Sequence, residues 1–530
     1  MRSSQYLEIS MQRRDLIKLA ASAALAQSLP RSLQATSRAD NLFALGVASG
    51  SPLHDGVVLW TRLIDPQGRQ FEQKPLAVAW EVADDEGFRR IVQKGSAPAL
   101  PELGHAAHVE LRGLQPDRWY FYRFQCGNSR SVTGRTRTFP LPGSAASKLR
   151  LSYASCQRWE HGYYAAWRHM QDEQLDAVCF VGDYIYEYTR SKKDIRSHDV
   201  GKPVDLPSYR DRYAVYKSDA DLQGMHAQCP WLLTWDDHEV INDYAGLQAP
   251  GLPADFPAQR AAAYQVYYEH MPLRASVLTQ GPTGMRAGAE MRLYDRVSFG
   301  DLADFHILDT RQYRTLQACS VDDKGGGNGV KRDACSALRD PQRSMLGFEQ
   351  EAWLAAGLKA ARQRPPKWTL IVQETRFGPM RSYNKKGETS VSNDTWDGYP
   401  GTRTRLVQAL IDTRAPNPVL LGGDVHSNWV GHVKADYEQP DSANVGIELT
   451  GTSISSNNNS PANIPRHVEE NPHFIFGDGY RRGYGVVELR PGRLTATLRV
   501  VSDVTQPDSG IETLASFEQE AGRALLQRTR

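Results

Sequence analysis

Three hydrophobic runs in this chain each end in residues able to bind a metal ion. They are the segments 180–186, 232–239 and 419–428, which finish in Asp183 and Tyr186, in Asp236-Asp237-His238-Glu239, and in Asp424-Val425-His426. A strand followed at once by Asp or His places these side chains at the carboxyl edge of a sheet, where α/β folds build their sites. Together with Ser155-Cys156-Gln157, the three runs predict a shared site for more than one metal ion.

The strand and helix signals divide the chain into two regions. Short β-rich runs separated by Gly, Pro and Asp predict an all-β, fibronectin- or immunoglobulin-like domain over 41–140. A small, turn-prone linker is expected at 141–148. From residue 149 to 530, strands alternate with helices, which predicts an α/β domain with a largely buried sheet. Its expected strands are 149–154, 177–182, 305–309, 368–372, 419–423, 484–489 and 494–501. Its expected helices are 162–174, 257–270 and 348–362, with a helix-like stretch at 513–527 whose position relative to the site stays open.

The first 40 residues have the layout of a twin-arginine signal. Arg13-Arg14 is followed by Leu16-Ile17-Lys18, then by an Ala-rich apolar stretch, 19–29, and small residues near Ala35. A short amphipathic helix is the alternative and fits the Arg-Arg spacing less well. The expectation is a protein exported by the twin-arginine translocation machinery to the periplasm or beyond, with either Met1 or Met11 as its start. No apolar run is long enough for a transmembrane segment.

Composition restricts the function only weakly. The chain is 40% hydrophobic and 23% charged, as in ordinary globular proteins, and its formal net charge is +2. No specific nucleic-acid binding is therefore expected. Cys319 and Cys335 flank a Gly-rich insertion, 322–330, and a disulfide between them remains open at this point.

The chemistry of each motif residue favours a particular role. Asp183 can bridge two metal ions, since each of its oxygens can take one. Tyr186 is favoured as a ligand, whereas Tyr184 and Tyr188 are expected to form a structural aromatic cluster. Cys156, at the end of a strand, is favoured as a thiolate ligand over a buried free thiol.

The segment 236–239 would be costly to bury unless its side chains coordinate something. A surface turn is the competing interpretation, and it accounts for Glu239 but not for the others. Asp237 is the expected ligand, and His238 is expected to protonate a leaving group. Asn242 offers a hard amide oxygen, while Asp424 and His426 can face one site.

Together these motifs resemble the alkaline phosphatase D (PhoD) family of the calcineurin-like metallophosphoesterase superfamily. The resemblance covers nearly the whole chain after the signal. It is carried by segments 44–50, 57–62, 155–157, 182–187, 235–239, 242–244, 308–311, 396–399 and 423–426.

The resemblance implies a fold, an activity and a metal centre. The fold would be a metallophosphoesterase sandwich of two mixed sheets flanked by helices. The activity would be hydrolysis of phosphomonoesters and phosphodiesters. Its motif positions imply Fe(III) held by Cys156, Asp183, Tyr186 and His426, and one or two Ca²⁺ ions held by Asp183, Asp237, Asn242 and Asp424. A dizinc or other divalent pair is the alternative.

Two arginines complete the expected site. Arg158 is a candidate catalytic phosphate clamp and Arg376 a candidate substrate-binding residue, each weighed equally against a surface arginine. Segment 396–399 is expected to be a structural loop near the site. Two functions compete with the phosphatase: a phospholipase D-type phosphodiesterase acting on phospholipids or envelope polymers, and a non-catalytic envelope protein. The second would be favoured by loss of a ligand from one metal motif, and none is missing.

Overall fold

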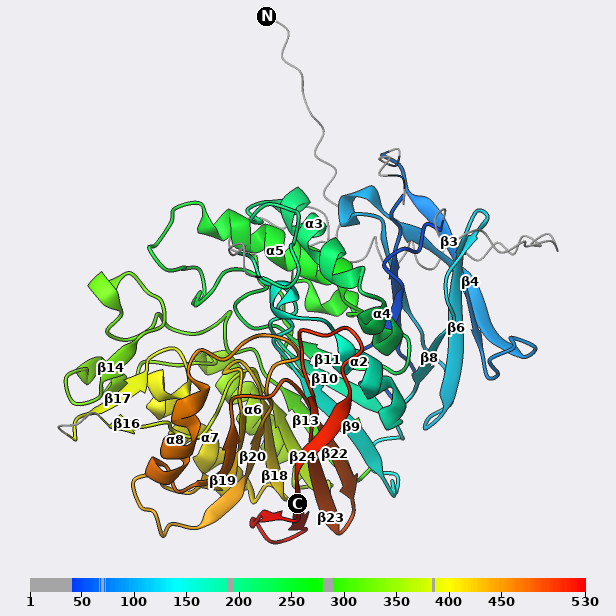
Figure 1. Cartoon of the computed structure of the whole chain (residues 1–530). Helices are drawn as coiled ribbons and strands as arrows, with labels where there is room; N and C mark the ends of the chain where they lie inside the picture. Colours follow the sequence, from blue (N-terminus) through cyan, green and yellow to red (C-terminus); the bar gives the residue numbers. More distant parts are fainter. Residues whose placement is uncertain are drawn as a thin grey trace, which may run out of the picture.

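The structure is a computed structural model that describes residues 41–65, 67, 71, 73–188, 194–279, 289–383 and 387–530. The expected signal, 1–40, lies outside these residues. Figure 1 shows the chain with its N-terminal strands at one side of the molecule and the C-terminal strands in the main body. No helix among the described residues is long and apolar enough to cross a membrane.

A ten-stranded sheet contains three parallel central strands, which lead to the site. These are β9 (Leu149–Ala154), β10 (Ala177–Val181) and β11 (Trp231–Thr234). On one side the sheet continues antiparallel through β22 (Gly483–Arg490), β23 (Arg493–Val501), β24 (Ile511–Glu520) and β25 (Gln527–Arg528). On the other side it continues through β1 (Val47–Gly50), β2 (Val58–Arg62) and β5 (Ala106–Glu110).

The expectation of a helix over 513–527 is wrong. Most of this stretch is β24, which pairs with β23 along the sheet. Ala515, Phe517 and Gln519 are buried at alternate positions, which is the period of a strand and not of a helix. Pairing with a distant strand therefore overrides the local helical signal.

A second, seven-stranded mixed sheet packs on the first. In order it contains β12 (Asp295–Phe299), β13 (Ala303–Ile307), β15 (Trp368–Val372), β18 (Pro418–Gly422), β20 (Asn444–Thr450), β19 (Asn428–Lys434) and β21 (Phe474–Asp478). Strands β13, β15, β18 and β20 are parallel. Cys179 and Leu232 of the first sheet share one apolar core with Leu370 and Leu421 of the second, so the two sheets lie face to face.

Helices cover the outer face of each sheet. The first sheet is covered by α2 (Ala165–Met170), α3 (Leu206–Lys217), α4 (Ala220–His226) and α5 (Phe256–His270). The second is covered by α6 (Phe348–Ala361) and α7 (Pro400–Thr413), while α8 (Ile464–Glu470) contacts β21. In β10, Val178 and Phe180 face the helices, and Cys179 faces the other sheet. Burial on both faces explains why the strand is a continuous apolar run.

The N-terminal region adds a five-stranded sheet. It contains β3 (Leu76–Ala83), β4 (Ile91–Ala99), β6 (Trp119–Cys126), β7 (Ser129–Arg130) and β8 (Gly134–Arg137). Val78 and Tyr122 of this sheet pack against Val47 and Leu59 of β1 and β2. Strand β1 in turn pairs with β11 through Gly50 and Trp231. One layer of the N-terminal region is thus continuous with the sheet that carries the site.

The Gly-rich insertion forms a small unit of its own. Strand β14 (Gly329–Lys331) pairs with β17 (Thr389–Ser392), which pairs with β16 (Ser382–Tyr383). A disulfide joins Cys319 and Cys335. This bond closes the loop that carries the glycines.

Candidate active site

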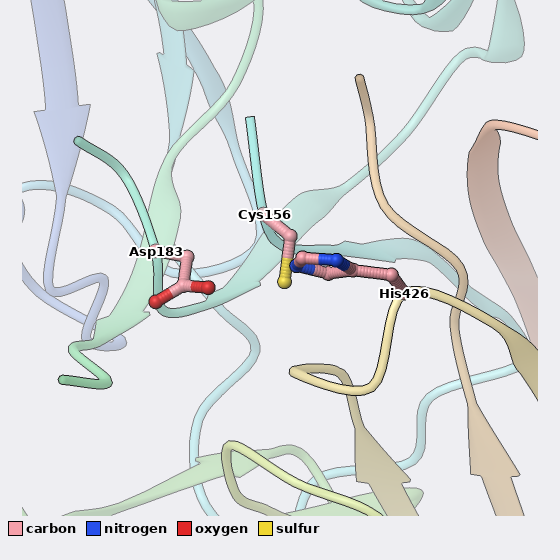
Figure 2. Close-up of side chains that lie close together, drawn as sticks. All are labelled: Cys156, Asp183 and His426. Carbon is pink, nitrogen blue, oxygen red and sulfur yellow. The ribbon is translucent and has the colours of Figure 1, made fainter. Parts of the chain in front are cut away.

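The loops after β9, β10, β11 and β18 meet at the carboxyl ends of the two sheets. Ligand atoms of Cys156, Asp183 and His426 lie within 4.8 Å of one another. Figure 2 shows the carboxylate of Asp183 and the ring of His426 on either side of the Cys156 sulfur. Segments 270 residues apart in the chain, from Cys156 to His426, are thus joined in one cluster.

The backbone at this cluster is strained. Cys156 and Asp183 both have φ of 59°, Asp424 has 64° and His426 has 51°. The left-handed region is unfavourable for residues with a Cβ, and such conformations concentrate at functional sites. The neighbouring position, Gly182, has no room for a side chain, because a Cβ there would lie 2.5 Å from the backbone nitrogen of Asp236.

Tyr186 belongs to the same cluster. Its hydroxyl donates to Asp183 Oδ2 at 2.8 Å and lies 3.0 Å from His426 Nε2. The other ring nitrogen of His426, Nδ1, is 2.8 Å from the Asn457 carbonyl oxygen. That bond fixes the proton on Nδ1 and leaves Nε2 as the electron-pair donor facing Tyr186 and Cys156.

A second group shares Asp183. Ligand atoms of Asp183, Asp237 and His238 also lie within 4.8 Å of one another. His238 Nδ1 contacts Glu187 Oε2 at 2.7 Å, and its ring centroid is 4.1 Å from that of Tyr186. Asp183 is therefore the residue common to both groups.

Asn242 and Asp424 lie beside this second group. The Asn242 backbone N–H donates to Glu187 Oε1 at 2.9 Å, so Glu187 holds both His238 and the Asn242 turn. Asp424 Oδ2 accepts a hydrogen bond from the Thr375 hydroxyl. Its pKa is raised by burial, with a smaller opposing effect from Arg311.

The side chains present suit a bound cation. Asp183 Oδ1 and Asp236 Oδ2 are buried and have no hydrogen-bond partner among the described residues. Burial raises the pKa of Asp183, Cys156 and Tyr186 well above their ordinary values. Such anions are costly to bury unless a positive charge compensates them. The mixture of one thiol, one phenol, one imidazole and several carboxylates is a metal-ligand set.

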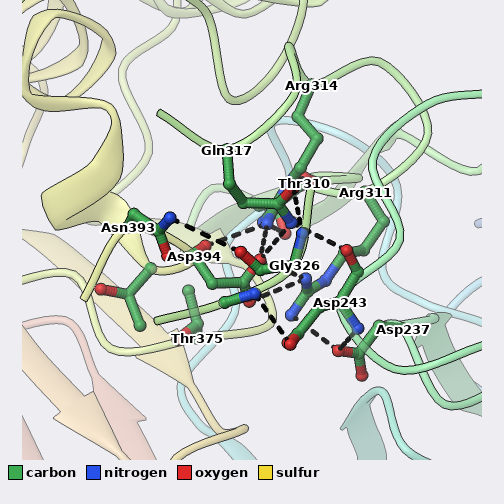
Figure 3. Close-up of polar contacts among 12 residues, drawn as sticks. Asp237, Asp243, Thr310, Arg311, Arg314, Gln317, Gly326, Thr375, Asn393 and Asp394 are labelled. Atoms are coloured by element: carbon green, nitrogen blue, oxygen red, sulfur yellow. Dashed lines mark hydrogen bonds and ion pairs between the residues drawn. The ribbon is translucent and has the colours of Figure 1, made fainter. Parts of the chain in front are cut away.

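Arg311 is a site residue to which the sequence analysis gave no role. It is buried and contacts Asp236 through Nε. Its Nη2 contacts Asp237 at 3.4 Å and its Nη1 contacts Asp394 at 2.9 Å (Figure 3). Arg311 and His238 oppose the effect of burial on Asp237 and lower the pKa of its carboxyl to about 2. Arg311 ends segment 308–311, which was one of the segments that carried the family resemblance. The sequence therefore marked this segment but did not indicate what Arg311 does.

Arg158 and Arg376 are both buried, so a surface role is wrong for each of them. Arg158 donates to Glu160 Oε2 through Nε at 3.0 Å, and its guanidinium carbon lies 5.6 Å from the ring centroid of Tyr186. Arg376 Nη2 lies 3.9 Å from Asp397 Oδ2. The structure therefore brings Arg158 to the Tyr186 side of the cluster, while Arg376 pairs with the 396–399 loop.

A surface position for Glu239 is also wrong. Glu239 is buried, and its carboxylate accepts hydrogen bonds from the backbone N–H groups of Asp183 at 3.2 Å, Tyr184 at 2.6 Å and Asp236 at 2.9 Å. These bonds tie together the turns after β10 and β11. Burial raises the pKa of Glu239 to about 7, against the lowering effect of these donors.

The fold and the candidate metal-binding groups described above are those of an enzyme. Comparisons with known proteins show the class of enzyme. Residues 151–498 match the protein family described as "PhoD-like phosphatase". Residues 26–140 match the family described as "PhoD-like phosphatase, N-terminal domain". Alkaline phosphatase D of Bacillus subtilis (strain 168) is 42% identical over 498 residues, covering 92% of this chain and 82% of that protein. A solved structure described as "Structure of PhoD" superposes with a TM-score of 0.84 at 40% identity, covering 94% of both chains.

The chain is a phosphoric ester hydrolase. It belongs to the PhoD-like phosphatase family.

Proposed function

We propose that this protein is an exported, metal-dependent alkaline phosphatase that hydrolyses phosphomonoesters and phosphodiesters. Its catalytic domain would be the metallophosphoesterase sandwich of 149–530, with 41–140 as the N-terminal β-sandwich domain and 141–148 as the linker. One observation carries the proposal: Asp183 is common to the cluster with Cys156 and His426 and to the cluster with Asp237 and His238. A shared carboxylate between two unlike donor sets is what a centre of two unlike metals requires.

The two proposed ligand sets start from these clusters and differ in chemistry; His238 of the second cluster is assigned to proton transfer and not to metal binding. Cys156, Asp183, Tyr186 and His426 would hold Fe(III), since thiolate and phenolate oxygen suit a strongly Lewis-acidic or soft ion. Asp183, Asp237, Asn242 and Asp424 would hold one or two Ca²⁺ ions, which prefer oxygen ligands. When bound, these ions would supply an activated water and neutralise phosphate oxygens.

The remaining residues would handle protons and the phosphate. Burial alone lowers the pKa of His238, but Asp183, Glu187 and Asp237 outweigh burial and raise its pKa well above the usual value. A protonated His238, oriented by Glu187, is suited to donate its Nε2 proton to the leaving alkoxide oxygen. Arg158 and Arg376 would contact phosphate oxygens.

The direct test is hydrolysis by the purified protein of an aryl phosphomonoester, an aryl phosphodiester and a phosphatidylcholine vesicle. We expect the two aryl esters to be cleaved, and His238→Gln to lower kcat on both by roughly 100-fold or more. As a matched control, His169→Gln, which changes a half-buried histidine bonded to the Ser509 carbonyl, should leave kcat unchanged. Choline release from vesicles without cleavage of the aryl esters would favour the phospholipase D-type alternative.

Export is tested separately. Arg13→Lys combined with Arg14→Lys should retain the protein in the cytoplasm if the twin-arginine machinery carries it. Unchanged export of this variant would contradict that part of the proposal.

A further inference from the structure

Two buried serines contact the phenol oxygen and the thiol sulfur of the cluster. Ser456 Oγ lies 2.9 Å from Tyr186 Oη, and Ser155 Oγ lies 3.1 Å from Cys156 Sγ. Both serines are essentially inaccessible to solvent. They come from segments that follow β20 and β9. Ser155 lay in a predicted site motif without a role of its own, and Ser456 was not among the predicted site residues.

The proton of Ser456 has two candidate acceptors, Tyr186 Oη and the Cys156 carbonyl oxygen at 2.8 Å. The Cys156 carbonyl also accepts the backbone N–H groups of Ser455 at 3.4 Å and Ser456 at 3.2 Å. Because it is already satisfied, it does not require the hydroxyl. An ionised Tyr186 oxygen is the stronger acceptor, since hydrogen bonds to charged oxygens are roughly twice as strong as neutral ones.

Ser456 is also positioned for donation. Its Oγ accepts the Arg158 backbone N–H at 3.1 Å, which fills one lone pair and polarises the O–H bond. Ser155 is similarly constrained, because its Oγ would lie 2.2 Å from a Cβ at Gly423 and so closely abuts that backbone. In the structure the Cys156 thiol donates to Ser155 Oγ at 3.1 Å. A cysteine that binds a metal carries no proton on its sulfur, so in the loaded site the hydrogen bond between the two atoms comes from the serine hydroxyl.

We propose that Ser456 and Ser155 are positioning residues that donate hydrogen bonds to the ionised Tyr186 oxygen and Cys156 sulfur and so tune the metal these two side chains hold. The inference rests on the iron ligand set of the proposed function and adds two residues to it. Each hydrogen bond withdraws electron density from an anionic ligand, so the ligand donates less charge and the bound ion stays a stronger Lewis acid. Loss of a serine hydroxyl therefore shifts ligand-to-metal charge transfer to lower energy.

The test is the visible absorption and resonance Raman spectrum of the iron-loaded full-length protein. Ser456→Ala should move the tyrosinate band to longer wavelength, and Ser155→Ala should move the thiolate band. Ser455→Ala is the matched control: Ser455 is equally buried, but its hydroxyl donates to the Arg158 carbonyl at 2.8 Å, so neither band should move. Ser456→Thr keeps a hydroxyl and should restore the wild-type spectrum.

Iron retention gives a second readout. Loss of partners that orient metal ligands typically weakens metal binding about 10–100-fold, so Ser456→Ala and Ser155→Ala should lose iron to a chelator at least about 10-fold more readily than Ser455→Ala. A coloured wild-type protein whose bands and iron retention are unchanged in Ser456→Ala and Ser155→Ala would overturn this inference alone. A colourless wild-type protein that holds no iron would overturn the ligand set, and the inference with it.

Discussion

The guanidinium of Arg311 donates through Nη1 to both carboxylate oxygens of Asp394, at 3.0 and 2.9 Å. The same side chain also contacts Asp236 and Asp237. One buried cation thus balances three buried carboxylates behind the candidate metal groups. Arg314 Nη1 adds a second contact to Asp394 at 2.8 Å.

Arg311→Met should leave these carboxylates without their main counter-charge. Removing one partner of a buried pair typically costs about 3–5 kcal/mol, and we expect the free energy of unfolding of the metal-free protein to fall by that amount. Denaturant unfolding measures it. Arg332→Met, which breaks an exposed pair with Glu438, is the control and should change the value by less than about 1 kcal/mol. Equal losses in the two variants would contradict the account.

Gly327 lies against the carboxylates on this side of the site. Its N–H donates to Asp243 Oδ2 at 2.8 Å, and a Cβ at this position would lie 3.0 Å from Asp394 Cβ. The Asp243 backbone N–H in turn donates to Asp237 Oδ2 at 2.7 Å. Gly327→Ala should therefore displace Asp243. With Asp237 in the proposed calcium ligand set, this variant should raise the calcium concentration for half-maximal activity by about 10-fold.

A control lies in the same loop. A Cβ at Gly329 would meet nothing within 4 Å, so Gly329→Ala should leave the calcium requirement unchanged. An increased requirement in both variants would point to general loosening of the loop instead of the Gly327 contact.

The Cys319–Cys335 disulfide closes a loop with a sequence separation of 16 residues. Closing a loop of this length stabilises a fold by about 3 kcal/mol in the chain-entropy description. Replacing both cysteines by serine should lower the free energy of unfolding by about that amount, measured against denaturant. The same variant should require more calcium, because the loop carries Gly327. A variant with wild-type stability and calcium requirement would show that the disulfide does not support the site.

Acid stability should depend on His306, a buried residue of β13 whose ring lies beside Trp353 of α6. Neither of its ring nitrogens has a hydrogen-bond partner among the described residues, and burial lowers its pKa to about 3. The folded protein holds this ring neutral, whereas the unfolded chain protonates it below a pKa of about 6.5. Its contribution to stability is therefore complete above pH 6.5 and is lost as the pH falls from there towards 3.

At pH 5 the lost contribution is about 2 kcal/mol for this one group. His306→Phe should remove this pH-dependent loss of stability. The fall in the free energy of unfolding between pH 8 and pH 5 should therefore be smaller in this variant by about 2 kcal/mol. The same pH dependence in both proteins would contradict the assignment.

Much of the fold was predictable because its signals are local. Helix α5 and strands β9, β10 and β15 follow from apolar spacing and continuous apolar runs. The failure at β24 has a physical cause, since its identity depends on pairing with β23 and not on its own spacing.

The residues of the candidate site likewise divide into those that local sequence signals predict and those that they do not. The positions of Asp183 and Asp237 could be predicted because they lie two and three residues after the ends of β10 and β11. Ser456 could not, because it reaches Tyr186 from 270 residues away. Glu239 was misplaced because three backbone donors, invisible in sequence, compensate its burial.

The measurement that most directly tests the shared role of Asp183 is the metal content and visible spectrum of the purified wild-type protein beside Asp183→Asn. The account predicts near-stoichiometric iron with a charge-transfer colour, together with calcium, in the wild type, and loss of both metals in the variant. Zinc alone in a colourless wild-type protein, or retention of both metals by Asp183→Asn, would contradict it.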